Sequence, residues 1–207
     1  MFASELTSGP VMMVGRVAEL ASRDTSDTRA RGRAEASLIR AAQRGSEEAM
    51  AELFRRHWRA AHRAAYLVVH DATAAEDIAQ EAFLAAIRAL DGFDRRRPFA
   101  PWLHRIVVNR AIDWARRRTL RAEVGYDLGG EQAAPPVAPA LADDLLAALA
   151  SLEPEQRAVV VLRHLLGYTP GQIAALLALP RGTVNSRLRR ALDRLGATIA
   201  EDLDARS

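Results

Sequence analysis

Residues 169–195 read TPGQIAALLALPRGTVNSRLRRALDRL, and they carry the clearest helical pattern in the chain. Thr169 is expected to cap a helix, because proline follows it and Gln172 completes a capping box three residues after the cap. Apolar residues then recur at helical spacing until a proline and a glycine interrupt them, and Thr183 offers a second cap. The pattern predicts two short helices around a tight turn, the second beginning at Thr183.

The second helix of this pair divides into an apolar stripe and a polar face. The stripe contains Val184, Leu188, Ala191, Leu192 and Leu195, and the residues off it are Asn185, Ser186, Arg189, Arg190 and Arg194. A short amide and a hydroxyl near a helix start, followed by arginines, suit the base edges and phosphates of duplex DNA. An ordinary helical hairpin with a solvated basic face is the alternative interpretation.

Composition limits the class of protein. The chain has 207 residues, 49% of them hydrophobic, which is enough for a buried core. It has no cysteine, which excludes disulfides, thiolate metal sites and cysteine nucleophiles. No apolar run approaches the roughly 18 residues of a membrane span. We therefore expect a cytoplasmic protein without membrane insertion.

The arginines lie in two blocks. All 29 basic residues are arginine; residues 95–121 hold nine of them with one aspartate, and residues 157–195 hold seven with one aspartate. Between the blocks, residues 122–156 hold seven acidic residues and no basic one. This distribution predicts two surfaces that face a polyanion, joined by a segment that avoids it.

The composition along the chain predicts an all-α fold with two small helical domains. Residues 1–33 lack periodicity and are expected to form a disordered tail. Residues 34–121 and 141–207 show helical spacing, and no strand pattern appears anywhere in the sequence. Residues 122–140 contain three glycines and three prolines, so we expect a flexible acidic linker there.

The pattern also predicts the elements of the first domain. Helical spacing runs from residue 37 to 90 with breaks near 45–46 and 70–73, so one helix is expected over 73–90. A loop is expected over 93–100 and a further helix over 101–118. One face of the core is expected to contain Leu53, Phe54, His57, Trp58 and Ala61.

Two motifs in the first domain carry more information. AEDIAQEAF at residues 75–83 places polar side chains about one turn apart on one side of a helix, with apolar ones behind them. Taken alone, a solvated helix face is the simpler interpretation of this motif. The second motif, WLHRIVVNRAID at residues 102–113, is followed by Arg116, Arg117 and Arg118.

The order of these motifs, followed by a linker and a C-terminal GTVNSRL helix, resembles the sigma-70 family of RNA polymerase initiation factors. The likeness is to the compact extracytoplasmic-function group. It implies a sigma2-like domain over 34–121, a sigma4-like helix-turn-helix domain over 141–207, and promoter-specific initiation. The implied partners are promoter DNA, the beta-prime clamp and beta flap of core RNA polymerase, and an anti-sigma factor.

The resemblance also implies three sets of contact residues. The set that docks on the clamp of the polymerase is Asp77, Gln80, Glu81 and Leu84. The set that melts and binds the minus-ten element is Phe99, Trp102, Arg105, Asn109, Arg110, Arg116 and Arg117. The set that faces the minus-thirty-five element is Thr183, Asn185, Ser186, Arg187, Arg189 and Arg190.

Residue chemistry suits these implied roles. A flipped base needs a pocket with stacking or hydrogen-bonding groups, which Phe99 and Asn109 are able to supply. Arginines hold phosphates and give affinity without sequence information. For Trp102, base stacking and core packing both stay open.

Three positions depart from the family pattern. Gln172 stands where glutamate is common, Ala178 where glycine is common, and Asn185 where lysine or arginine is common. A left-handed conformation at Ala178 would cost about 1 kcal/mol. A neutral amide at Asn185 suits adenine better than guanine.

Three other classes of function are alternatives to this one: an enzyme, a one-component regulator and an interaction protein. The five histidines show no metal-ligand spacing and the chain has no glycine-rich phosphate loop, so we expect no enzyme, metal site or cofactor. A one-component regulator would use the same C-terminal helices but bind duplex DNA without polymerase. An interaction protein is the third alternative.

Overall fold

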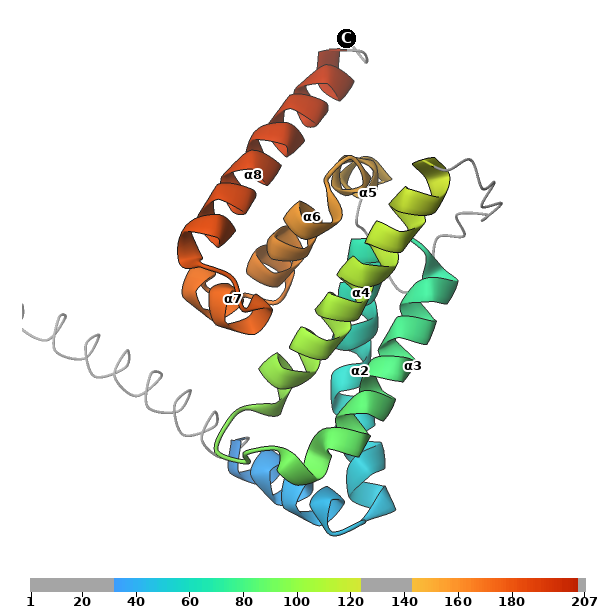
Figure 1. Ribbon diagram of the computed structural model, residues 1–207, viewed down its shortest axis with the longest axis vertical. Coiled ribbons are helices and arrows are strands. Elements are labelled where there is room, and N and C mark those ends of the chain that lie inside the picture. The colour runs from blue at the N-terminus through green and yellow to red at the C-terminus, as the bar shows by residue number, and fades with distance from the viewer. Residues whose placement is uncertain (1–31, 124–142, 205–207) are drawn as a thin grey trace, which may run out of the picture.

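The computed structural model describes residues 32–123 and 143–204, and helices make up most of both ranges (Figure 1). Within those two ranges no strand occurs, so the predicted all-α fold is confirmed. Residues 1–31 of the predicted tail and 124–140 of the predicted linker lie outside the described residues. Residues 32–33 and 122–123, at the edges of these two predicted segments, are helical, so both predicted boundaries are wrong by two residues.

The first domain is a bundle of helices (Figure 1). Its elements are a helix described over residues 32–43, α2 Glu47–Val69, α3 Ala72–Ala89, the short 3₁₀ turn η1 Leu90–Gly92 and α4 Phe99–Glu123. The helices α2, α3 and α4 each pack against the other two. The side-chain amide of Gln43 donates to the carbonyls of Leu90 and Phe93 at 2.9 and 3.1 Å, which fixes the N-terminal helix to the end of α3.

Local capping explains where the first helices begin and end. The Ser46 hydroxyl accepts from the Ala49 amide at 3.2 Å, so α2 begins at residue 47. His70 ends α2 in a left-handed conformation with φ of 53°. The Asp71 carboxylate then accepts from the Ala74 amide at 2.9 Å, so α3 begins one residue before the predicted start.

The predicted core face of α2 is confirmed only in part. Leu53 and Ala61 are buried, and His57 and Trp58 are half-buried. Phe54 is 38% exposed, because it lies at the edge of the bundle, stacked on Trp58 with ring centroids 4.7 Å apart. Its other neighbour is Phe83 of α3, at 4.8 Å.

The loop before α4 is shorter than predicted, since α4 begins at Phe99 and not at residue 101. Pro101 lies inside the first turn, where a missing backbone N–H costs nothing because no helical carbonyl precedes it. The helix also continues past residue 118 to Glu123.

The second domain contains α5 Asp143–Ala150, α6 Pro154–Val160, the π-helical turn η2 Val161–Leu165, α7 Pro170–Leu177 and α8 Arg181–Asp204. The predicted capping box of α7 is present: the amide of Gln172 donates to the Thr169 hydroxyl at 3.3 Å, and the Thr169 amide donates back to the Gln172 side chain at 2.8 Å. Ala178 ends α7 with φ of 53°, the left-handed conformation that glycine adopts more easily.

Two details of the predicted second helix are wrong. The helix α8 begins at Arg181, because the amide of Val184 already donates to the carbonyl of Pro180 at 3.2 Å; Thr183 therefore lies in the first turn and is not the cap. Leu192 is 48% exposed and lies outside the buried stripe. The other four stripe residues, Val184, Leu188, Ala191 and Leu195, are buried as predicted.

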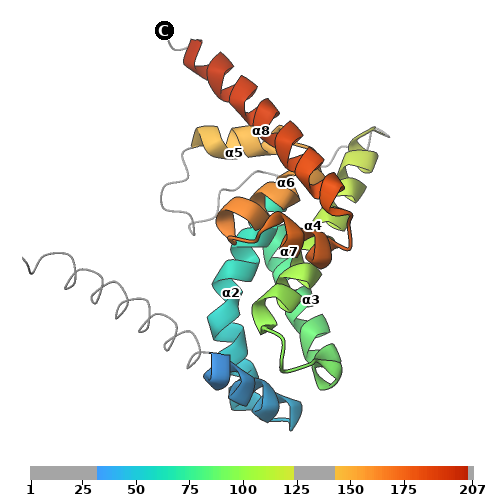
Figure 2. The same ribbon diagram turned by 90° about the vertical axis from the view of Figure 1, so that its left-hand side faces the viewer.

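The two domains touch each other. Helix α6 packs against α2 and α4, and α7 packs against α4, so that α8 lies on the outer side of the second domain (Figures 1 and 2). Among the described helices, none combines the length and the apolarity that crossing a membrane requires.

Candidate nucleic-acid and protein interfaces

One face of α3 carries the residues of the AEDIAQEAF motif. Its buried side holds Ile78, Ala82 and Phe83, which leaves the opposite side to solvent. The structure brings together the four residues of the predicted docking set there, all exposed: Asp77, Gln80, Glu81 and Leu84. Leu84 is 51% exposed and Ile87, one turn on, is 43% exposed. Sequence reasoning missed Ile87, although its spacing from Leu84 places it on the same face.

A groove of about 330 Å³ runs between α3 and α4 beside this face. It is lined by residues of two predicted sets, with Asp77 and Glu81 on α3 and Arg110 and Arg117 on α4. Arg110 Nη1 lies 2.9 Å from Glu81 Oε2, and the two side chains are 38% and 64% exposed to solvent, so this ion pair is worth at most about 1 kcal/mol. Each residue is therefore easily released to another partner.

Aromatic rings cluster at the start of α4. Phe99 is only 3% exposed and lies among His57, Phe93 and Trp102, with ring centroids 5.1, 5.8 and 5.5 Å away. Trp102 is half-buried and lies 4.6 Å from Phe93. Base stacking requires an uncovered ring, so this arrangement offers part of Trp102 to a base while Phe99 packs in the core.

The rest of α4 presents a basic face. Arg105, Asn109, Arg116 and Arg117 are exposed, and Arg110 is half-buried. Arg116 Nε donates to Glu155 Oε1 of the second domain at 2.6 Å. Arg118 Nη1 binds Asp71 at 2.9 Å and its guanidinium lies 5.3 Å from the centre of the Trp114 ring.

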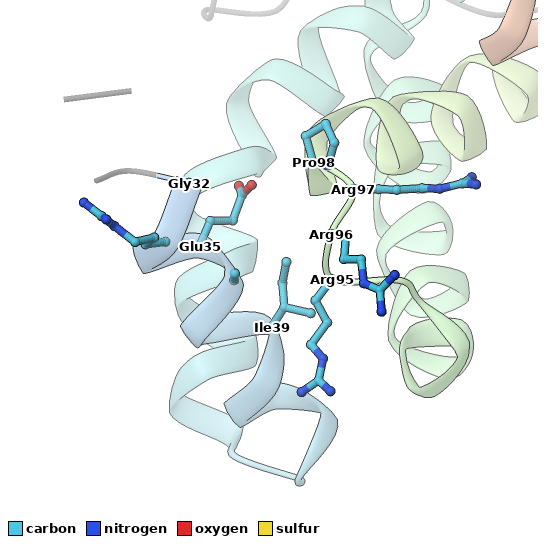
Figure 3. Close-up of a pocket in the computed structure, with 9 residues that line it drawn as sticks. Gly32, Glu35, Ile39, Arg95, Arg96, Arg97 and Pro98 are labelled. Carbon is cyan, nitrogen blue, oxygen red and sulfur yellow. The ribbon is translucent and has the colours of Figure 1, made fainter. Parts of the chain in front are cut away.

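A basic pocket of about 440 Å³ lies between the N-terminal helix and the loop before α4 (Figure 3). The loop contributes Arg95, Arg96, Arg97 and Pro98, and the helix contributes Arg33 and Glu35. Glu35 accepts from His57 at 3.0 Å, and this hydrogen bond is the main cause that lowers the pKa of the Glu35 carboxyl. Sequence reasoning missed these arginines as site residues, although three successive arginines in a predicted loop were a signal for them.

The start of α8 presents the third predicted set. Asn185, Arg189 and Arg190 are exposed, whereas Thr183, Ser186 and Arg187 are half-buried. The Ser186 hydroxyl donates to the Thr183 carbonyl at 3.0 Å, and Arg190 Nε donates to the Ser186 carbonyl at 3.3 Å. These side chains lie on the side of α8 opposite the stripe that packs in the core. A helix that binds in a groove of DNA has the same arrangement, with one face packed in its domain and the other facing the bases.

The titratable clusters in the two described ranges do not resemble a metal site. No group of three or more histidine, aspartate or glutamate side chains converges there in a way that would hold a metal ion.

Comparison with known proteins gives two matches in the predicted order. Residues 53–121 match the family model of Sigma-70 region 2, and residues 142–195 match that of Sigma-70, region 4. The chain is 38% identical over 167 residues to the ECF RNA polymerase sigma factor SigM of Mycobacterium tuberculosis, covering 79% of this chain and 83% of SigM. It is 29% identical over 172 residues to SigW of Bacillus subtilis, covering 76% and 92%.

A solved structure supports the same conclusion. CnrH, solved in complex with the cytosolic domain of CnrY, superposes with a TM-score of 0.63 at 32% identity, covering 82% of this chain and 99% of CnrH. The chain therefore belongs to the extracytoplasmic-function group of the sigma-70 family. It is a sigma factor, which binds core RNA polymerase and directs initiation at specific promoters; such proteins are initiation factors and not themselves enzymes.

Proposed function

We propose that the domain over 34–121 docks on the polymerase and opens the minus-ten element, and that the domain over 141–207 reads the minus-thirty-five element. The observation that carries the proposal is the exposure of one polar face on each of α3, α4 and α8, while the opposite faces form the core. The chain is proposed to act in the cytoplasm, where the polymerase is.

The exposed face of α3 is the proposed contact with the beta-prime clamp. Asp77, Gln80 and Glu81 supply hydrogen-bonding groups that another protein is able to pair, and Leu84 supplies apolar area at their edge. Exposed polar side chains beside an exposed leucine are typical of a protein–protein surface. The beta flap is proposed to contact the second domain.

The exposed face of α4 is the proposed contact with the minus-ten element. Arg105, Arg116 and Arg117 hold phosphates, Arg110 joins them on release from Glu81, and Asn109 binds a base edge. Trp102 offers a half-buried ring for stacking, and Phe99 supports it from the core side. The role of Phe99 is thus indirect.

The start of α8 is the proposed major-groove reader. Asn185, Arg189 and Arg190 reach base edges, together with the Ser186 hydroxyl. The half-buried Thr183 and Arg187 lie at the rim of this face and contact phosphates.

Regulation by a second protein is also proposed. CnrH is solved in complex with the cytosolic domain of CnrY, and this chain matches CnrH over nearly all of that protein's length. We infer that an anti-sigma factor binds this chain as well.

The proposal is tested with purified core RNA polymerase, the full chain and the DNA upstream of its own gene. Promoter-specific transcripts are expected only when the chain is present. The Asp77→Ala/Gln80→Ala variant should weaken core binding at least tenfold with an unchanged thermal melt, because both side chains are exposed. The matched control is Glu47→Ala/Glu48→Ala, which changes exposed polar residues at the start of α2. Equal core binding by both double variants would reject the docking face.

Tight promoter binding by the free chain, without polymerase, would instead favour a one-component regulator.

A further inference from the structure

The N-terminal helix over residues 32–43 lies beside the segment that joins α3 to α4 (Figure 3). Ile39, which is 1% exposed, anchors this helix in the hydrophobic core. The helix precedes residue 53, where the match to Sigma-70 region 2 begins, so that match assigns it no role. Two of its polar side chains, those of Glu35 and Gln43, bind the two ends of the joining segment.

Gln43 holds the end of the segment that follows α3. Its side-chain amide donates to the carbonyls of Leu90 and Phe93 at 2.9 and 3.1 Å. A glutamine amide has two N–H groups, so one side chain is able to bind both carbonyls. The Leu90 carbonyl also accepts from the Phe93 N–H at 2.9 Å. These contacts fix the position of Phe93, at which η1 ends.

Glu35 holds the other end of the segment, where α4 begins. Its carboxylate accepts from His57 of α2 at 3.0 Å and from the backbone N–H of Phe99. Phe99 is the first residue of α4, so its N–H has no helical carbonyl to bind. A carboxylate here also interacts favourably with the partial positive charge at the start of a helix. Glu35 therefore caps α4 from another helix.

Between these two holds, residues 94–98 form a short loop with the sequence DRRRP, which we call the arginine loop. The Asp94 carboxylate accepts from the Arg96 N–H at 3.0 Å, and all three arginines are exposed. The rings of Phe93 and Phe99, on either side of the loop, have centroids 5.8 Å apart. The loop is thus fixed at two ends that lie close together, while its arginines face solvent.

The same contacts set the position of Trp102 in the first turn of α4. Its half-buried ring lies 4.6 Å from that of Phe93 and 5.5 Å from that of Phe99. A site that is already arranged for its ligand avoids the cost of ordering on binding. Any conformer that is unable to bind lowers the apparent affinity in proportion to its population. Order at the two ends of the loop therefore favours tight binding of one DNA geometry.

We propose that Glu35 and Gln43 are positioning residues for minus-ten recognition, which hold the arginine loop and Trp102 in the geometry that fits the DNA. Neither residue acts by touching DNA. The inference rests on the proposed function of α4. It makes a helix outside the proposed reading surface responsible for part of the base preference.

Three changes at two positions test the role of Glu35. Glu35→Ala removes both hydrogen bonds at the start of α4, and Glu35→Gln removes the charge but keeps an oxygen that accepts them. Glu52→Ala is the matched control, because the Glu52 side chain is 25% exposed, against 23% for Glu35. The ion pairs of Glu52 with Arg55 and Arg56 stay within α2.

The first measurement uses the free full-length chain. Because the chain has no cysteine, a spin label on Arg96→Cys reports on the arginine loop alone. Glu35→Ala should raise the ratio of mobile to ordered label about tenfold, as expected for the loss of a hydrogen bond to a charged group. Glu35→Gln should raise it less than about threefold, and Glu52→Ala should leave it unchanged. Equal spectra for the two alanine variants would overturn the proposal.

The other end of the loop gives an independent variant. Gln43→Leu keeps the size of the side chain and removes both donors to Leu90 and Phe93. It should increase the mobile component in the same direction, and it tests the hold on the loop even where Glu35→Ala does not fold. An unchanged loop spectrum in a folded Gln43→Leu chain would reject the role of Gln43.

The second measurement uses core RNA polymerase with the unlabelled full chain on promoters randomised in the minus-ten element. Glu35→Ala should reduce the preference among these sequences by up to about tenfold, with unchanged affinity for non-specific DNA, because phosphate contacts are retained. Glu35→Gln should restore most of the preference. An equal gain in affinity for all DNA in both variants would mean that the carboxylate only repels phosphates, which overturns the positioning role.

Failure of this inference is distinct from failure of the proposed function. If the starting chain gives promoter-specific transcripts and Glu35→Ala keeps the full minus-ten preference, the positioning role is rejected and the proposed function stands. If the starting chain itself gives no promoter-specific transcripts, the proposed function fails, and the positioning role fails with it.

Discussion

His104 Nδ1 lies 2.8 Å from the Tyr168 hydroxyl, and this hydrogen bond joins α4 of the first domain to the segment before α7 of the second. His104 is 5% exposed, and burial is the main cause that lowers its pKa from 6.5 to about 4. Burial also raises the pKa of Tyr168 to about 12. Both side chains are therefore neutral at pH 7, and the contact is a hydrogen bond between uncharged groups.

Folding stability should consequently fall in mild acid. The unfolded chain takes up a proton on His104 near pH 6.5, whereas the folded chain resists protonation until about pH 4, so each step down in pH between these values favours unfolding. His70, whose pKa burial lowers to about 3, acts in the same direction. The slope for one histidine approaches about 1.4 kcal/mol per pH unit.

Urea titrations at pH 6.5, 6.0, 5.5 and 5.0 measure this slope. The His104→Gln variant should show a shallower decline than the starting chain, by about the contribution of one proton. The pKa of the Glu35 carboxyl is lowered, so Glu35 stays ionised throughout this pH window and does not contribute to the measured slope. Parallel curves for the two proteins would contradict the assignment of His104 as buried and neutral.

A second prediction concerns Arg157. Replacing it with methionine keeps apolar length but removes the guanidinium from four carbonyls, those of Val68, Leu149, Ala150 and Leu152. Of these, the Leu149 carbonyl keeps a second donor, the Leu152 amide at 3.2 Å. We expect Arg157→Met to lower the free energy of unfolding by about 3 kcal/mol, measured by urea denaturation. Arg163→Met is the control, because Arg163 is exposed and donates to one carbonyl, that of Tyr168 at 3.2 Å. A loss of less than about 1 kcal/mol is expected there.

The helix starts and buried faces that could be predicted from the sequence are those that depend on residues close together in the chain. The box between Thr169 and Gln172 fixes the start of α7, and the apolar stripe of α8 packs as its spacing indicates, apart from Leu192. The start of α8 was missed by two residues, because a backbone bond to the Pro180 carbonyl closes the first turn without a side-chain cap. Such a bond leaves no sign in the residue types.

Contacts between the domains could not be predicted. His104 and Tyr168 are 64 residues apart and Arg157 and Val68 are 89 apart, so no periodicity connects them. The exposed faces of α3 and α8 could be predicted from helical spacing, since a buried stripe on one side of a helix leaves the opposite side to solvent. The burial of Phe99 does not follow from it, because the rings that cover Phe99 come from α2 and the loop at Phe93.

A third prediction concerns the left-handed residue Ala178. Because its φ is 53° and its side chain is exposed, Ala178→Gly should remove strain without losing buried area. The expected result is a gain of up to about 1 kcal/mol in the free energy of unfolding. Ala175→Gly, at an exposed position inside α7, should cost about 1 kcal/mol instead. Thermal melts of both variants measure the difference, and a loss of stability in both would contradict the strain at Ala178.

The last prediction concerns base preference at Asn185. This exposed amide at the start of α8 pairs with the N6 and N7 edge of adenine, whereas arginine in its place pairs with the O6 and N7 edge of guanine. Asn185→Arg should therefore shift preference from adenine to guanine at one position of the minus-thirty-five element, by about 1–3 kcal/mol or roughly 5- to 150-fold. Transcription from a library of randomised minus-thirty-five sequences, with holoenzyme carrying either residue, measures this shift. Arg194→Ala is the control, since Arg194 lies on α8 beyond the proposed reader and should leave base preference unchanged. An equal gain on every sequence would mean that the new arginine binds phosphate and that position 185 does not read a base.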